Sequence, residues 1–341
     1  MKNLYTIFTV KFVNMKTTQS VLFFLTLLLF FNCKEKVQNQ DYILKGAVFG
    51  TTYKISYQNA SKNYQKSLDS LFTIINNSVS TYITTSDISR INNGENEIIV
   101  DEIFKEVLKK SKKIHKETNG FFDPTVGNLV NAYGFGPENK RNILTDEEIK
   151  NQMQFVGLNK VILRENRIIK KHPKVYLDFN SIAKGFGIDI VARFFNTKNI
   201  DNYLIEIGGE IKAKGYKKNN EPWIIKLVNP INAYDNEGFK VINLSNKSMA
   251  TSGNYRKFWI SENGKKYVHT INPKTGLAKE SNLLSASVIA NLDCADVDAY
   301  ATAFMAMGLE KTKDFLKDRN DLKVILIYTS NNGTLAEFST Y

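Results

Sequence analysis

Strand-like and helix-like segments alternate along this chain without a separating linker, and this pattern constrains the fold more than any other feature. Residues 48–57 are rich in β-branched and aromatic side chains, which favours a strand. Residues 64–80 and 101–118 instead place apolar side chains at helical spacing, and Thr145 with Glu148 forms a capping box that predicts another helix start. Further strands are expected near 175–179, 203–207, 223–228, 286–290 and 323–329. Without repeats or a proline-rich hinge, the pattern predicts one compact mixed α+β domain, with or without two lobes around a cleft.

The composition indicates a folded protein and gives no sign of a nucleic-acid partner. Hydrophobic residues make up 43% of the 341 positions and charged residues 23%, which is typical of a globular protein. The formal net charge is +12, but lysine and arginine do not gather in a run with aromatic residues between them. We therefore attribute the charge mainly to a solvated surface, with attraction of anionic ligands or lipid headgroups as the alternative.

The beginning of the chain predicts export. Lys16 precedes an apolar run at 21–31, which is shorter than the roughly 20 residues that a membrane-spanning helix needs. A positive charge followed by a short apolar run is typical of a secretory signal. Translation from Met15 would give a more typical signal than translation from Met1.

Cys33 follows the apolar run as the acylated cysteine does in the lipobox of bacterial lipoproteins, although Phe31 and Asn32 replace the usual small residues. We therefore expect a membrane lipoprotein of the cell envelope that faces the periplasm. Its parts would be a signal peptide at 1–32, a lipid anchor and tether at 33–41, and a folded domain at 42–341. The alternatives are cleavage elsewhere with loss of Cys33, or retention of the run as an uncleaved anchor.

Cys294 is the only other cysteine, so a lipidated Cys33 leaves no partner for an intramolecular disulfide. No histidine or Asn/Asp constellation surrounds Cys294 in the sequence. We expect it to be a small buried side chain rather than a nucleophile.

Residues 250–276 place polar side chains where catalytic groups often occur. Thr251, Ser252 and Gly253 precede a loop with His269, one of three histidines in the chain. Polar groups at turns between strands commonly bind or react with ligands. The alternative is an ordinary surface hairpin, because 263–264 and 273–276 are standard turn signals.

Residues 120–137 combine four glycines with Phe121, Phe122 and Asp123. Such a segment suits a loop whose backbone approaches a flat ligand closely. The alternative is a glycine-rich connection whose aromatic side chains fill the core.

Two further segments suit anionic ligands. In residues 177–187 a strand is expected to end at Asp178, Ser181 to cap a helix, and Lys184 to lie in its first turn, where free N–H groups attract phosphate. The spacing of a P-loop is absent. Residues 206–210 contain Gly-Gly and are either an ordinary tight turn or a place where a ligand approaches the backbone.

Asp298 and Thr302 are four residues apart and share one face of the helix expected there. Carboxylate and hydroxyl oxygens suit Mg²⁺, which takes few protein ligands and keeps several waters. Most such pairs on ordinary helices bind nothing.

Taken together and in this order, these segments resemble the FAD:protein FMN transferase family, the ApbE-type flavin transferases, many of which are periplasmic lipoproteins. The resemblance covers nearly all of 42–341, through the segments at 50–57, 80–92, 120–137, 178–189, 206–215, 250–258, 269–276 and 296–308. The chain differs from the family pattern at Asn254 and Asn272, where aspartates are usual, and at Ala301, where some members carry an acid.

The resemblance implies a flavin-binding cleft and a set of site residues. FAD would contact Phe49, Tyr82, Phe121, Phe122, Asp123, Asp178, Lys184 and Ile271. Mg²⁺ would be held by Ser181, Asp298 and Thr302, and the catalytic residues would be His269 and Asp298. His269, with a titration near neutrality, would accept a proton or orient a phosphate.

The implied reaction is Mg²⁺-dependent transfer of FMN from FAD to a threonine hydroxyl of an acceptor protein, with release of AMP. The implied acceptors are subunits of Rnf-type or sodium-pumping NADH:quinone oxidoreductases. A Mg²⁺-dependent FAD pyrophosphatase that gives FMN and AMP uses the same groups with water in place of threonine. A flavin-binding lipoprotein without catalysis is the alternative from a different class.

Overall fold

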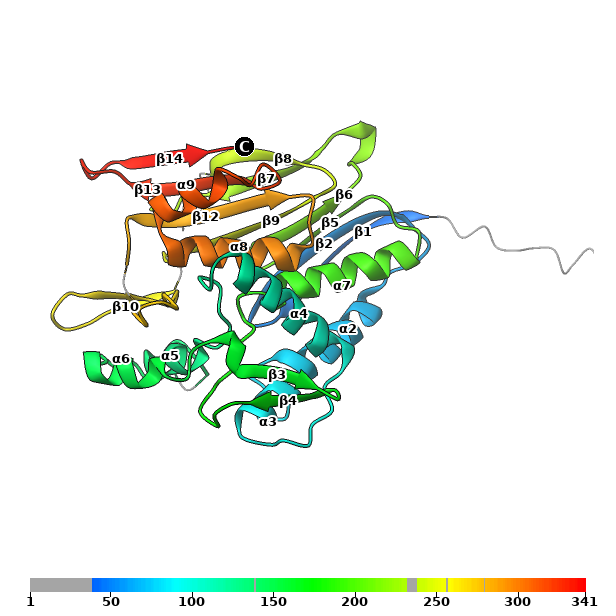
Figure 1. Ribbon diagram of the computed structural model, residues 1–341. Helices are drawn as coiled ribbons and strands as arrows, with labels where there is room; N and C mark the ends of the chain where they lie inside the picture. Colours follow the sequence, from blue (N-terminus) through cyan, green and yellow to red (C-terminus); the bar gives the residue numbers. More distant parts are fainter. Residues whose placement is uncertain (1–38, 138, 232–237, 256, 279) are drawn as a thin grey trace, which may run out of the picture. The chain divides into compact units, whose positions relative to one another are not determined.

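The computed structural model describes residues 39–137, 139–231, 238–255, 257–278 and 280–341. Gln40–Tyr341 form one compact unit (Figure 1). The expected signal peptide at 1–32 and Cys33 lie outside the described residues. Within the part that is described, no helix is both long and apolar enough to cross a membrane.

An eight-stranded sheet in which every neighbouring pair is antiparallel forms the centre of the unit (Figure 1). Its strands, in spatial order, are β1 (Gln40–Val48), β2 (Thr51–Ala60), β5 (Tyr203–Ile207), β6 (Glu210–Lys214), β9 (Lys247–Gly253), β12 (Leu283–Ala290), β13 (Lys323–Thr329) and β14 (Leu335–Ser339). With the helices described next, the sheet confirms the mixed α+β fold class.

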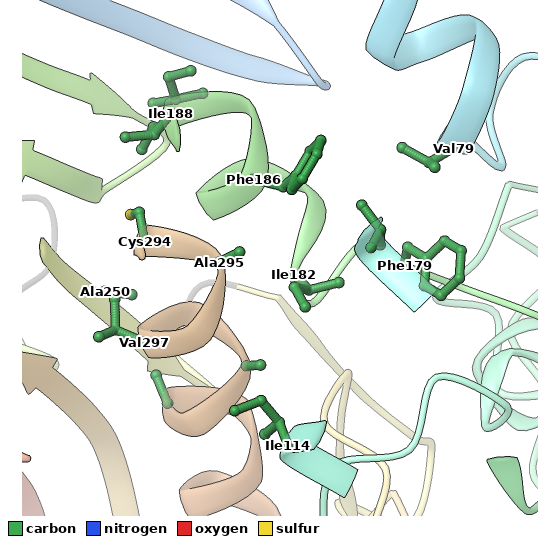
Figure 2. Packing of buried hydrophobic residues seen from close by; sticks show 14 of the residues in the cluster. Val79, Ile114, Phe179, Ile182, Phe186, Ile188, Ala250, Cys294, Ala295 and Val297 are labelled. Carbon is green, nitrogen blue, oxygen red and sulfur yellow. The ribbon is translucent and has the colours of Figure 1, made fainter. Parts of the chain in front are cut away.

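One face of the sheet packs against helices. Helices α7 (Ala183–Thr197) and α8 (Cys294–Met307) contact strands β5, β6, β9 and β12, and α2 (Gln65–Val79) and α4 (Glu102–Glu117) pack outside them. Figure 2 shows Phe186 of α7, Val297 of α8 and Ala250 of β9 in this core, which is the largest buried cluster. Burial of this surface is the main stabilising contribution of the fold.

A separate hairpin of β7 (Trp223–Val228) and β8 (Gly238–Leu244) packs against part of the other face. Strand residues alternate between the two faces of a sheet. Accordingly Ala250 points toward the helices while its neighbour Met249 packs with the hairpin. Trp223, Ile225 and Leu227 of β7 join Met249 in this second core.

A third, smaller core lies around α5 (Gly127–Ala132), α6 (Asp146–Met153) and the hairpin of β10 (Phe258–Ile260) and β11 (Lys266–Val268). The Trp259 ring stacks on Tyr267 with centroids 4.4 Å apart. The capping box of Thr145 and Glu148 is present at the start of α6, as predicted. The remaining described elements are α3 (Asp87–Asn92), η1 (Leu158–Lys160), β3 (Val161–Arg164), β4 (Arg167–Lys170), η2 (Lys218–Asn220) and α9 (Leu309–Leu316).

Three local predictions need correction. Residues 175–179 do not form a strand, because the Asn92 side chain takes the place of a strand partner: it accepts from Leu177 N at 2.9 Å and donates to Leu177 O at 2.8 Å. Ser181 does not cap α7, whose N-cap is Ile182 without a side-chain hydrogen bond. Residues 48–57 contain the end of β1, a turn with positive φ at Phe49 and Gly50, and most of β2.

Candidate active site

A cavity of about 270 Å³ lies where the amino-terminal end of α7, one face of α8, the end of β9 and the third core meet. The predicted site residues that line it are Tyr82, Phe121, Phe122, Asp123, Asp178, Ser181, Lys184, His269, Ile271, Asp298 and Thr302. The structure therefore brings all but one of the predicted residues together, although they come from segments more than 200 positions apart.

Phe49 is the exception, since it does not line this cavity. Its ring packs edge-on against Phe72, with centroids 5.7 Å apart, and lies so close to Gly187 that a Cβ there would be 2.5 Å from it. The turn between β1 and β2 directs this side chain into the core, so the structure does not support a contact between Phe49 and a ligand in the cavity.

Asp298 is buried at the contact between α7 and α8. Asp298 is 2% exposed, and its Oδ2 accepts a hydrogen bond from Gly185 N at 3.1 Å. The two helices approach this closely because residue 185 is glycine: a Cβ there would lie 2.4 Å from Cys294 O. Burial raises the pKa of Asp298 above its ordinary value, Glu210 raises it further, and the Lys184 charge opposes both.

Lys184 is held in place by a residue that the sequence did not single out. Its Nζ lies 2.7 Å from Oε1 of Glu210, which is 2% exposed. Glu210 directly follows the Gly208-Gly209 turn that joins β5 to β6, and Gly208 has the positive φ of 65° that this turn requires. In the sequence, Glu210 could have been singled out only as an acidic residue directly after Gly-Gly at the start of a strand.

The residues around Asp298 fit a divalent cation. Thr302 Oγ1 lies 3.2 Å from Ser252 Oγ, and both residues line the cavity with Asp298 and Ser181. Glu210 Oε2 is buried and has no hydrogen-bond partner within the described ranges. Those ranges contain no group of three or more His, Cys, Asp or Glu that could hold a metal. An oxygen-rich site with few carboxylates is the kind that Mg²⁺ uses, because this ion keeps several waters.

His269 follows β11 and is held by the backbone of Lys257. Its Nδ1 lies 3.1 Å from Lys257 O, so Nδ1 carries the proton and Nε2 of the neutral ring can accept one. Burial lowers the pKa of His269 to about 4, and the charges of Lys257 and Lys184 act in the same direction. The expectation of a titration near neutrality is therefore wrong, although a neutral imidazole can still act as a base.

The other end of the cavity is aromatic. Lys274 Nζ and Lys311 Nζ lie 5.7 and 5.1 Å from the centroid of the Phe121 ring, and Tyr82 is 55% exposed. The Asp123 carboxylate is hydrogen-bonded within its own loop: its Oδ1 accepts from Thr125 N at 2.9 Å and from Thr125 Oγ1 at 2.6 Å. The Asp123 carboxylate thus fixes the loop that forms this end of the cavity.

Lys257 is a second cavity residue that the sequence analysis missed. Its Nζ donates to Phe135 O at 2.7 Å, and burial lowers its pKa while Asp178 raises it. Asp178 is itself buried, and this burial raises its pKa. Because lysine is abundant throughout the chain, nothing in the sequence distinguishes Lys257 from a surface residue.

Comparisons with known proteins agree with this geometry. Residues 49–326 match the ApbE family. A Haemophilus influenzae protein named FAD:protein FMN transferase is 35% identical over 311 residues, which cover 87% of this chain and 89% of that protein. A Vibrio cholerae protein of the same name is 34% identical over 317 residues, covering 90% and 93% of the two chains. The solved structure of the flavin transferase ApbE from Vibrio cholerae superimposes with a TM-score of 0.78 at 31% identity, covering 88% of this chain and 97% of the other.

Proposed function

The chain belongs to the ApbE family and transfers FMN from FAD to protein, and we propose that it modifies a threonine hydroxyl, with Mg²⁺ as the cation and AMP as the leaving group. The observation that carries the metal and the leaving-group chemistry is the buried carboxylate of Asp298 beside the Thr302 hydroxyl and the Lys184–Glu210 ion pair. These groups suit a pyrophosphate whose charge must be neutralised during transfer.

In the proposed reaction the threonine oxygen attacks the phosphorus of the FMN half of FAD. The bond from this phosphorus to the bridging oxygen breaks, and the bridging oxygen leaves with AMP. Asp298 and Thr302, with Ser181 and Glu210 nearby, would hold Mg²⁺, and the ion would neutralise charge on the pyrophosphate. Lys184, positioned by Glu210, adds positive charge at the same place.

We propose that His269 accepts the proton of the threonine hydroxyl. Its imidazole is neutral near pH 7, and the hydrogen bond from Nδ1 to Lys257 O leaves Nε2 as the acceptor. At the other end of the cavity, Phe121 and Tyr82 provide aromatic surfaces for the flavin ring. The lysines beside Phe121 lie close enough to contribute a positive field at that ring.

The test is an incubation of the mature domain with FAD and Mg²⁺, with and without the flavin-accepting domain of an Rnf-type or sodium-pumping NADH:quinone oxidoreductase subunit. We expect in-gel flavin fluorescence on the acceptor, AMP in equal amount, and loss of both with EDTA. Peptide mass spectrometry should locate FMN on a threonine. AMP and free FMN with an unlabelled acceptor would instead indicate the pyrophosphatase, and tight FAD without either product would indicate a binding protein.

We also propose that the protein is a lipoprotein anchored at the periplasmic side of a membrane. The proposal is supported by the apolar run at 21–31 and by Cys33, which follows it after Asn32. In the native host, the wild-type protein should sediment with membranes and take up labelled fatty acid, and Cys33→Ala should take up no label while retaining its transferase activity. A membrane-bound wild-type protein without label would indicate an uncleaved apolar anchor instead.

A further inference from the structure

The β7–β8 hairpin covers only part of the sheet face on which it packs, and its two edges have different surroundings. The β8 edge faces β14 and the carboxyl terminus: Lys240 Nζ lies 2.5 Å from Glu337 Oε1, and Tyr341 OH donates to Asn243 O at 2.9 Å. Strand β7 pairs with β8, and among the described residues no strand pairs with its other edge. That edge faces the part of the sheet formed by β2 and β5.

A groove of about 430 Å³ runs along this edge of β7. Residues 224–228 all line it, and because successive side chains alternate in direction, the groove follows the backbone edge rather than one face of the strand. Its opposite side includes Thr52 of β2 and Glu206 of β5. Ile224 is 52% exposed and offers an apolar contact along the groove.

The groove leads to the cavity that holds the catalytic groups. Gly208 and Thr251 line both spaces. Thr251 and Ser252 are neighbours on β9 and point to opposite faces of the sheet, Ser252 toward Thr302 with the two hydroxyls 3.2 Å apart. The groove and the cavity therefore meet at the ends of these strands, beside Gly208 in the β5–β6 turn, and a hydroxyl that enters there reaches the place where we locate the pyrophosphate.

We propose that the acceptor protein binds as an extended strand along the free edge of β7, so that its target hydroxyl enters the cavity past Gly208 and Thr251. Alternate residues of an edge strand direct their N–H and C=O groups away from the existing partner, and an extended peptide can pair with them. Five paired residues would extend over about 17 Å. This inference rests on the proposed transfer to a protein hydroxyl, because only that reaction requires a polypeptide beside FAD.

The binding mode is tested first by hydrogen exchange on the wild-type mature protein. The probe is the same oxidoreductase-subunit domain, added in excess in the presence of AMP so that no turnover occurs. We expect slower exchange of amides in Trp223–Val228 and no change in the β14 segment Leu335–Ser339. Protection that spares Trp223–Val228 would overturn the inference.

Two substitutions test the same groove by kinetics. Thr52→Trp places an indole in the groove at an exposed position outside the catalytic set, whereas Val241→Trp places the same bulk on β8, where the side chain is 60% exposed and outside the groove. Thr52→Trp should raise KM for the acceptor by at least about tenfold, with KM and Kd for FAD unchanged. Val241→Trp should behave as wild type. Equal KM values for the two variants would overturn the inference, and wild-type protein that labels no acceptor would overturn the proposed function with it.

Discussion

At the scale of single residues, we expect the reaction to depend most on Asp298, a buried carboxylate that accepts a hydrogen bond from a backbone amide and lies among hydroxyl and charged groups. Asp298→Asn keeps the size of the side chain but removes the negative charge that would bind Mg²⁺. We expect the turnover number to fall by about 10²–10³, the usual effect of removing one group that stabilises charge in a transition state. The Kd for FAD, measured by flavin fluorescence, should change much less because the aromatic end of the cavity is intact. If Asp298→Asn turns over at the wild-type rate and is still inhibited by EDTA, Asp298 is not part of the metal site.

His269 provides a prediction about pH. Its pKa of about 4 lies below the ordinary value of 6.5, so between these two values the unfolded chain binds a proton that the folded chain does not. The free energy of unfolding should therefore decrease as pH falls from 6.5 to 4, and the part that is due to this residue should be absent in His269→Ala. The chain has only three histidines, which makes an NMR titration practical.

The NMR titration should show one imidazole, assigned by its loss in His269→Ala, that remains neutral until well below pH 6. The same variant should retain its fold at pH 7 and transfer FMN more slowly, by about 10²–10⁴ if His269 is the general base. A midpoint near 6.5 would mean that the ring is better solvated than its surroundings indicate. An unchanged rate of transfer would mean that another group accepts the threonine proton.

At the scale of secondary structure, the contact between α7 and α8 determines where Asp298 lies. Gly185→Ala would place a methyl group 2.4 Å from Cys294 O, so the helices must separate and the hydrogen bond from Gly185 N to Asp298 must lengthen. We expect a loss of about 1–3 kcal/mol in the free energy of unfolding, measured in urea, as is usual for overpacking. We also expect a loss of turnover in protein that is still fully folded.

Gly238→Ala is the matched control for Gly185→Ala. A Cβ on Gly238 would have its nearest neighbour, Lys226 Cβ, at 3.3 Å, a tight contact that a shift of a few tenths of an ångström relieves. It should change neither the turnover nor the EDTA sensitivity of the enzyme. If Gly185→Ala loses stability without losing turnover, the close approach of the helices serves the core alone.

The elements also show what the sequence can predict. Where periodicity is clear, as in α2, α4, β5, β7 and β13, it predicted the elements well, because the pattern of burial is itself local. The strand expected at 175–179 failed because Asn92, more than 80 positions away, provides the hydrogen bonds of a strand partner through its side chain. Glu210 and Lys257 were missed for a related reason, since only the tertiary structure brings them to the cavity.

At the scale of the whole molecule, the cavity lies where separately packed parts of the unit meet. Asp298 and Ser181 belong to the parts packed around the main core, whereas Phe135 and Ile271 belong to the third core and line the same cavity. A ligand that contacts both sides therefore links the third core to the rest of the unit. This arrangement follows from contacts between distant segments, so the pattern of elements left a cleft open as one alternative, and the resemblance to a family implied it.

FAD binding should consequently stabilise the third core more than the β7–β8 hairpin. A ligand that binds only the folded chain raises the free energy of unfolding by about 2.7 kcal/mol at 100 times its Kd. With FAD and EDTA, hydrogen exchange should slow in α5, β10 and β11, and should not change in β8. AMP alone should protect these elements less, because it lacks the flavin that would contact Phe121. Equal protection by AMP and FAD would show that the aromatic end of the cavity does not hold the flavin ring.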